Sequence, residues 1–480
     1  MTIKKKAVDG LFWSFIDSIA GQGIQFIVAL ILARILSPND FGLIGMLAVF
    51  IAISESFINS GFSQALIRKQ SCTQKDLSTV FYFNLIVAVI FYGILFISSK
   101  SISVFFNEPK LQSLIKVLGL SLILNSISLI HRTLLTKELK FKLQARISVV
   151  TSILSGAVAI GFAYNGFGVW SLVILSLCRF GINSLLLWFW SVWRPVLVFS
   201  LKSFNELFAF GSKLLLSGLI DTIYRNVYNL VIGKFFSAKQ LGFYTRADQF
   251  KMITSQNLQS IISRVSFPLL SQIQDDTERL KVTYQKLLKS TMFITFFLML
   301  GMGAVAESMI VTLIGEKWLV SVEYLQLLCF VGMLYPIHAL NLNILNVKGR
   351  SDLFLKIEII KKIIEVPVIV IGIFWGIKIM IIAMIINSII AYFLNSFWSG
   401  KLIAYPAKEQ LKDIFPSLIM ALSVNLFVFV LGNCLDLSPL LLLIVQVATG
   451  VIITILICEL IRFEEYLYIK KTILDTLKKK

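Results

Sequence analysis

Long apolar runs, each ended by a short polar or charged stretch, repeat along the whole chain. The first two runs extend over 11–36 and 41–62. Ser37-Pro38-Asn39-Asp40 separates them, since Pro fixes φ and Asn and Asp favour turns. Runs of about 20 apolar residues are long enough to cross a bilayer as helices. The pattern therefore predicts an all-α, polytopic membrane protein.

We expect fourteen transmembrane spans from this pattern. They lie near 11–36, 41–62, 78–99, 111–131, 147–164, 168–190, 207–231, 247–271, 290–314, 323–346, 357–376, 378–400, 412–432 and 438–461. Lys and Arg concentrate in the connections on the side of the N-terminus, as the positive-inside rule describes for the cytoplasmic face. Both termini are therefore expected in the cytoplasm.

Composition supports a membrane protein and excludes several other classes. The 480 residues are 57% hydrophobic and 15% charged, whereas soluble domains carry about 25% charged residues. The net charge of +19 does not predict nucleic-acid binding, because the charges form short clusters between apolar runs. The five cysteines and two histidines are scattered, and no GxxxxGK[ST] loop or Ser/His/Asp set is recognisable. We therefore expect a transporter without a bound cofactor or metal, not an enzyme.

A faint internal echo, two hundred residues apart, predicts two related lobes. Ser37 and Gly42 in the first turn region correspond to Ser237 and Gly242 in the second. Weak repeats of this kind are typical of transporters. We predict an N-terminal lobe at 1–195 with spans one to six and a C-terminal lobe at 200–402 with spans seven to twelve. Spans thirteen and fourteen fill 408–462, and 463–480 is a basic cytoplasmic tail, either an amphipathic surface helix or a solvated end.

Polar and charged residues inside the expected spans are the candidates for cargo contacts, because charges in hydrocarbon are costly. They are Asp17, Glu55, Arg179, Asp221, Arg225, Asp248, Lys251 and Gln259. Asp221 and Arg225 stand at i and i+4 and can form an ion pair. Two interpretations are open: the set lines a wet cavity with charges of both signs, or it consists of polar contacts that hold helices together.

Three segments of the chain carry a resemblance to a known family. The first segment is LARILSPNDFGLIGM, continued by GFSQALIRKQ. The second is SRVSFPLLSQIQDDTERLKVTYQKLLKS. The third, GEKWLVSVEYLQLLCFVGMLYPIHALNLNILNVKGRSDLFLKIEIIKK, is the most specific. Together they resemble the Wzx-type polysaccharide flippases, close to the colanic-acid exporters, a family of the multidrug/oligosaccharidyl-lipid/polysaccharide (MOP) transporter superfamily.

The resemblance implies a MATE-like fold of two pseudo-symmetric six-helix lobes with two extra C-terminal helices. It implies a bacterial inner-membrane flippase for undecaprenyl-pyrophosphate-linked oligosaccharide repeat units, working by alternating access in polysaccharide biosynthesis. Its partners would be this lipid-linked oligosaccharide, membrane lipids, and the polysaccharide polymerase and export machinery. The driving force would be a proton gradient, a sodium gradient or the membrane potential.

Two other functions stay open beside the flippase. A MATE-like drug or cation antiporter would need a cavity dominated by carboxylates, whereas Arg179, Arg225 and Lys251 accompany the acids here. A membrane polysaccharide polymerase would be expected to expose a large outer loop, and the expected outer connections are short. Arg225, with Arg179 and Lys251, is the expected phosphate contact, because a guanidinium can bind two phosphate oxygens at once.

Overall fold

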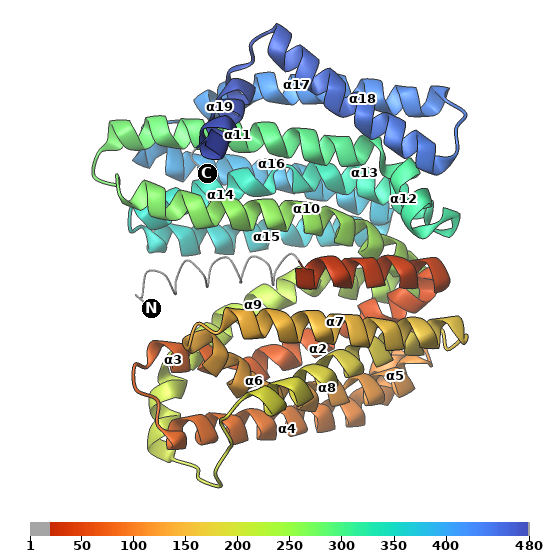
Figure 1. Ribbon diagram of the computed structural model, residues 1–480, viewed down its shortest axis with the longest axis vertical. Helices are drawn as coiled ribbons and strands as arrows, with labels where there is room; N and C mark the ends of the chain where they lie inside the picture. Colours follow the sequence, from red (N-terminus) through yellow and green to blue (C-terminus); the bar gives the residue numbers. More distant parts are fainter. Residues whose placement is uncertain (1–19, 479–480) are drawn as a thin grey trace. The chain divides into compact units, whose positions relative to one another are not determined.

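The computed structural model describes residues 20–478, which fold into α-helices joined by short connections (Figure 1). No β-strand occurs within this range. The helices before residue 242 are Ala20–Ile35, α2 (Pro38–Asn59), α3 (Phe62–Arg68), α4 (Gln74–Phe106), α5 (Leu111–Leu118), α6 (Leu120–Lys137), α7 (Phe141–Tyr164), α8 (Trp170–Trp190), α9 (Leu201–Phe235) and the start of α10 (Ala238–Ser271). Those after it are α11 (Thr277–Ala304), α12 (Ala306–Ile314), α13 (Val320–Gly332), α14 (Tyr335–Val347), α15 (Ser351–Trp375), α16 (Ile377–Leu402), α17 (Ala407–Cys434), α18 (Pro439–Leu460) and α19 (Glu464–Lys478).

Eleven helical segments between residues 20 and 478 are long and apolar enough to cross a membrane. They match eleven of the expected spans in order. The other three expected spans fall at Ala20–Ile35, which is shorter, and at α10 and α15, which carry several charged residues. The all-helical, multi-pass class is confirmed, and the count of fourteen stays a prediction.

Contacts divide the chain into two compact units, and the boundary between them in the sequence follows Gly242, inside α10. The expected lobes at 1–195 and 200–402 are defined by a symmetry relation, which this division does not test. Each unit is therefore described by itself.

The polar stretch after the first helix starts the second one. Ser37 caps α2: its Oγ accepts a hydrogen bond from the Asp40 backbone N–H, and the Asp40 carboxylate accepts one from the Ser37 backbone N–H. Pro38 occupies the first turn, where its missing N–H costs nothing. The predicted break is thus a helix start, and the chain turns in very few residues.

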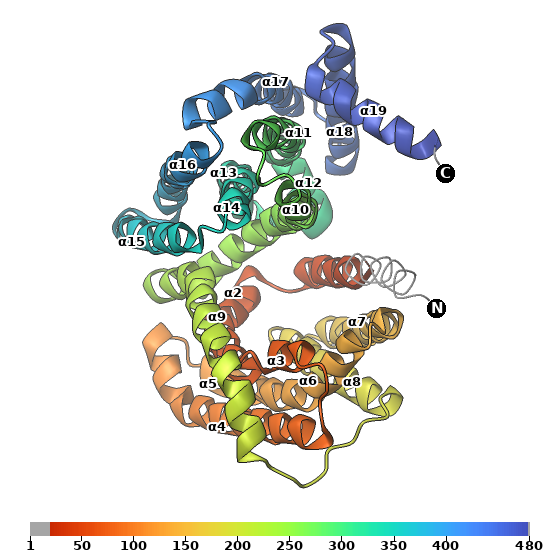
Figure 2. The same cartoon turned by 90° about the vertical axis from the view of Figure 1, so that its left-hand side faces the viewer.

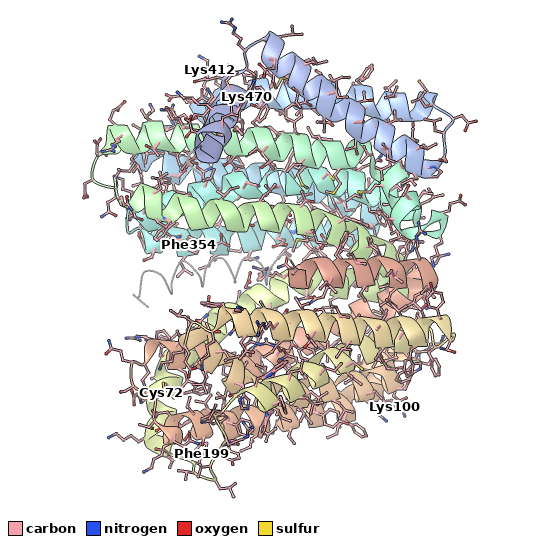
Figure 3. All side chains as sticks on the ribbon, viewed as in Figure 1. Cys72, Lys100, Phe199, Phe354, Lys412 and Lys470 are labelled. Atoms are coloured by element: carbon pink, nitrogen blue, oxygen red, sulfur yellow. The ribbon has the colours of Figure 1, made fainter. Side chains whose placement is uncertain are left out.

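In the first unit α4, α6, α7 and α8 pack as a bundle, and Figure 2 shows α6, α7 and α8 nearly end-on. The connection 191–200, which contains Phe199, lies beside the start of α4, close to the connection that contains Cys72 (Figure 3). Gln74 Nε2 donates to the Arg194 carbonyl at 2.6 Å, and the Val196 N–H donates to Ser78 Oγ at 3.1 Å. These bonds hold the connection between α8 and α9 against the start of α4.

In the second unit α11 packs along α17, and α13, α14 and α16 complete the interior. Trp318, Tyr284 and Tyr405 are among the largest fully buried side chains. Gly376, with φ +95°, makes the tight turn between α15 and α16. The tail predicted after Phe463 forms α19, which carries Lys470 (Figure 3), and α19 contacts α11 and α18.

Candidate functional site

A polar cavity of about 260 Å³ lies inside the first unit, between Ala20–Ile35, α6, α7 and α8. Its polar lining includes Gln25, Arg132, Gln144, Thr151, Arg179 and Asn183. The helices around it belong to the apolar, membrane-crossing set or, for Ala20–Ile35, to the shorter apolar helices. A polar interior between such helices marks a functional site by default, because it is costly to maintain in a bilayer.

Helical periodicity explains why these side chains converge. On α8, Arg179, Asn183 and Leu187 follow at i, i+4 and i+8, so they share one face. On α7, Gln144, Ser148 and Ser152 follow at the same spacing. Since α7 and α8 pack against each other, the two faces enclose the cavity.

Both cations of the cavity are arginines, and one carboxylate lies within electrostatic range. Arg179 stands near the middle of α8, roughly 15 Å from either end at 1.5 Å per residue. Arg132 comes from the last turns of α6. Glu55 on α2 interacts electrostatically with both guanidinium groups, and the two guanidinium groups act on each other. The arrangement suits an anion that would offset the repulsion between the two arginines.

Some polar atoms of the lining have protein partners and some do not. Gln25 Nε2 donates to Ser152 Oγ at 3.3 Å, and Gln144 Nε2 donates to Thr136 Oγ1 at 2.8 Å. Within the described residues, Thr151 Oγ1 and Asn183 Nδ2 are buried without a hydrogen-bond partner. Buried polar atoms are normally paired, so these two are exceptions, and neither atom has accessible surface toward the cavity.

The structure brings together Arg179 and Glu55, two of the residues predicted from the sequence. Asp17, also predicted, lies outside the described residues. Arg132 was missed, because the expected span ended at His131 whereas α6 continues to Lys137. Its signal in the sequence was only a charge at a span edge, which usually means an interfacial side chain.

Arg225 and Asp221 form the predicted i,i+4 ion pair on α9, with Arg225 Nε 2.7 Å from Asp221 Oδ2. The two side chains are 63% and 55% exposed. Neither is among the residues that line the cavity of the first unit.

Lys251, in the second unit, is buried and pairs with Asp248 one turn earlier on α10. Its Nζ also lies 3.4 Å from the hydroxyl of Tyr335 on α14. Gln259 is half-buried further along α10. Lys251 is therefore held by an ion pair within α10 and by a hydrogen bond that it donates to α14.

The sequence profile described as "Polysaccharide biosynthesis protein" matches residues 31–323, more than half of the chain. The chain belongs to this family. It is 30% identical to lipopolysaccharide biosynthesis protein WzxC of Escherichia coli (strain K12) over 82% of this chain and 81% of that one. It is a Wzx-type flippase of the MOP superfamily, a transporter and a multi-pass membrane protein, as the motifs indicated.

Solved structures of two membrane transporters share the fold of this chain. The inward closed conformation of the lipid II flippase MurJ superposes with a TM-score of 0.73 at 16% identity, covering 94% of this chain and 99% of that chain. An inward-facing multidrug transporter of the MATE family gives a TM-score of 0.63 at 16% identity, covering 82% and 98%. At these identities the likeness shows the fold, and the MATE-like class is confirmed.

The second unit of the flippase has a separate cavity of about 400 Å³ between α12, α17 and α18. Glu307 and Glu316 line it together with Gln446, whose Oε1 accepts from Ser308 Oγ at 2.6 Å. Its charge is opposite in sign to that of the first cavity. Within residues 20–478 no group of three His, Cys, Asp or Glu side chains is placed to hold a metal.

Proposed function

We propose that this flippase moves oligosaccharide repeat units linked to undecaprenyl pyrophosphate across the bacterial cytoplasmic membrane, by alternating access, for exopolysaccharide, capsule or lipopolysaccharide synthesis. The observation that carries the proposal is the polar cavity with Arg132 and Arg179 inside a bundle of apolar helices. A pyrophosphate diester stays anionic at neutral pH and cannot cross about 30 Å of hydrocarbon unaided. Membrane-embedded guanidinium groups supply the charge and hydrogen-bond donors that such a head group needs.

A cation antiporter fits the cavity less well. Cationic cargo requires an excess of carboxylates, whereas this cavity has two arginines within range of one glutamate. The likeness to the MATE transporter concerns the fold alone. An anionic cargo is therefore the better match for this site.

The negative charge of the proposed cargo decides in which direction the membrane potential would drive it. An inside-negative potential favours outward movement of an anion by about 2.3 kcal/mol per charge per 100 mV. A proton or sodium gradient is a second source in this proposal, and polymerase and export proteins would receive the flipped units. The distribution of Lys and Arg supports a cytoplasmic position for both termini in this proposal. A reporter active only outside, fused after Lys480, should give no signal, and a strong signal would contradict this orientation.

Deleting the gene in a polysaccharide-producing host and isolating the lipid-linked sugars tests the function. We expect lipid-linked repeat units to accumulate on the cytoplasmic side and polymer export to stop. Expressing the chain again should reverse both effects. Normal export in the deletion strain, with no accumulated intermediate and no second transporter of this family in the genome, would contradict the proposal.

A further inference from the structure

The pocket of about 400 Å³ in the second unit lies between α12, the end of α17 and the start of α18. Figure 1 shows α12 and the connection from α17 to α18 at one end of this unit, and α19 at the other end. Both α17 and α18 are long and apolar enough to cross a membrane. A pocket at the ends of two such helices lies near the boundary between lipid and water.

One wall of this pocket is a polar side chain on a very apolar helix. Gln446 is 4% exposed and lies on α18, the most apolar of the eleven candidate spans between residues 20 and 478. Its Oε1 accepts from Ser308 Oγ on α12, and its Nε2 donates to the Val428 carbonyl on α17 at 3.2 Å. A buried amide costs free energy unless it is bonded in this way. The bonds join three helices and fix the polar wall of the pocket.

Two exposed carboxylates also line the pocket. Glu307 lies on α12, and Glu316 follows that helix. Glu323, a few residues further on, pairs with Lys378, whereas neither Glu307 nor Glu316 has an ion pair within the part of the chain that the structure describes. Two carboxylates on one pocket attract a cation, because their potentials add.

The remaining lining favours a cation with a hydrocarbon part. Apolar side chains make up much of the other walls, among them Val311, Leu319 and Leu442. A second, largely apolar pocket of about 290 Å³ shares Ala304 and Phe429 with the first and continues between α11, α13 and α17. Apolar surface of this kind is covered favourably by a hydrocarbon chain. A polar pocket that adjoins an apolar one matches an amphiphile with a cationic head.

The acceptors of the pocket restrict the kind of cation. A primary ammonium group has three N–H donors, and carboxylates accept charge-assisted hydrogen bonds from it. A quaternary ammonium such as choline has no N–H and is bound by cages of aromatic rings. Phe429 is the only aromatic residue on this pocket in the described part of the chain. The pocket therefore suits a primary ammonium better than a quaternary one.

We propose that this pocket binds a phospholipid with a primary ammonium headgroup, phosphatidylethanolamine, from the surrounding membrane. Glu307 and Glu316 accept hydrogen bonds from its ammonium group, the Asn433 amide donates to its phosphate, and one acyl chain lies in the adjoining apolar pocket. The volume of about 400 Å³ falls within the roughly 300–1,000 Å³ of small-molecule sites. The lipid stabilises the packing of α18 on α12 and α17, since it binds only the folded chain. This site does not depend on which cargo the flippase moves.

Binding of single lipids to the purified full-length chain in detergent tests the site. Dioleoyl phosphatidylethanolamine and dioleoyl phosphatidylcholine are titrated separately, and native mass spectrometry gives the dissociation constant of each. The two lipids share the phosphate and the acyl chains and differ in the ammonium group. We expect phosphatidylethanolamine to bind at least about tenfold more tightly, which is 1.4 kcal/mol. Equal affinities for the two lipids overturn the proposal.

Variants of exposed residues assign this preference to the pocket. Glu307→Gln combined with Glu316→Gln keeps the shape of both side chains and removes their charge, so the preference should fall below about threefold. Glu278→Gln, which changes an exposed glutamate in the first turn of α11 outside the pocket, is the matched control and should keep the full preference. Leu426→Trp adds a larger ring to the apolar pocket at a position that is 64% exposed, and it should weaken both lipids by a similar factor.

Two soluble cations separate the lipid from other ligands of the same charge. Mg²⁺ and free ethanolamine are each added to the lipid-bound chain at the concentration of the lipid. We expect neither to displace the lipid, because neither covers the apolar pocket. Displacement by one of them makes the pocket a site for a soluble cation and overturns the proposal, as does a preference that the double glutamine variant leaves unchanged. The expected pattern in a chain that never restores polysaccharide export supports the lipid site and contradicts only the proposed function.

Discussion

Gly42 on α2 lies directly against the backbone of Ala238, at the start of α10: a Cβ on Gly42 would overlap the Ala238 carbonyl group. The reciprocal contact also exists, because a Cβ on Gly242 would overlap the carbonyl group of Pro38. Both helices start in the same way, with Ser37 Oγ accepting from the Asp40 N–H and Ser237 Oγ accepting from the Gln240 N–H. The weak sequence echo thus marks the first turns of α2 and α10, whose backbones contact each other at Gly42 and Gly242.

Gly42→Ala should therefore destabilise the protein, since the added methyl group meets backbone atoms that cannot rotate away. Overpacking costs on the order of 1–3 kcal/mol even where side chains can adjust, so we expect at least that loss. The thermal unfolding midpoint of the purified protein in detergent measures it.

Gly93→Ala on α4 is the matched control, because nothing lies within 4 Å of a Cβ there. Replacing a helical glycine by alanine without a clash is neutral or stabilising by up to about 1 kcal/mol. Equal unfolding midpoints for Gly42→Ala and Gly93→Ala would show that the glycine crossing is not needed for packing.

The buried ion pair of α10 predicts an asymmetric response to substitution. The side chain of Lys251 is 3% exposed and that of Asp248 is 30% exposed. Asp248→Ala leaves a buried lysine without its carboxylate and should cost about 3–5 kcal/mol. Lys251→Met leaves a carboxylate that water can reach, so it should cost less.

Combining Lys251→Met with Asp248→Asn should recover most of the stability lost in Asp248→Ala, because no unpaired charge remains. Urea or thermal unfolding of the three variants, compared in one detergent, gives the order of their stabilities. If Asp248→Ala unfolds like the wild type, the pair does not stabilise the second unit.

Arg225 on α9 forms an exposed ion pair with Asp221, which should contribute little to the stability of the fold. Exposed i,i+4 ion pairs contribute about 0.3–0.5 kcal/mol, so Arg225→Ala should fold normally. The prediction from the sequence is that Arg225 touches the cargo phosphate, so Arg225→Ala should lose polysaccharide export and Arg225→Lys should keep part of it. Export is compared at matched amounts of protein in the membrane, and full export by Arg225→Ala would remove Arg225 from the site.

The docking of α19 should depend on pH. Hydrogen bonding from Lys289 on α11 holds the pKa of the Glu464 carboxyl below its usual value of 4.5. A pKa that is lower in the folded state means that the contact stabilises docking above pH 4.5 and is lost as pH falls through the lowered pKa. Hydrogen exchange of the α19 amides, corrected for intrinsic rates, should therefore speed up in acid.

Lys289→Gln should give fast exchange in α19 at neutral pH and remove most of the pH dependence. Lys471→Gln, which changes an exposed lysine on α19 itself, is the matched control. Exchange in α19 that is the same in Lys289→Gln as in the wild type would show that this contact does not hold the helix.

The hydrophobic pattern predicted which segments cross the membrane better than where helices end. The expected span at 290–314 begins inside α11, which already starts at Thr277. The helix is longer than the apolar run because its first turns can extend into water, where Lys and Arg side chains are solvated. The expected span at 323–346 is two helices, α13 and α14, because Pro336 sits in the first turn of α14. Hydropathy reports contact with lipid, and caps and prolines decide helix boundaries.

The candidate site was predictable only as far as single helices allow. The sequence indicated Arg179 as a charged residue inside a span and paired Asp221 with Arg225, and the structure has Arg179 in the cavity and forms this pair. The sequence could not show that Arg132 from α6 meets Arg179, because that depends on how α6 packs on α8. The unpaired hydroxyl of Thr151 has no signal in the sequence, since threonine is common in membrane helices.

Transport by the purified chain tests the central claim most directly. The protein is reconstituted into liposomes that contain undecaprenyl-pyrophosphate-linked oligosaccharide from the native host, and an added enzyme modifies only the sugar exposed on the outer leaflet. The account predicts that, with an imposed potential or ion gradient, protein-containing liposomes expose more of the initially protected sugar over time. Arg179→Ala should reduce that rate at least about tenfold, as expected for the loss of a charge-assisted contact. A rate equal to that of protein-free liposomes, for correctly folded wild-type protein under each of these gradients, would contradict the account.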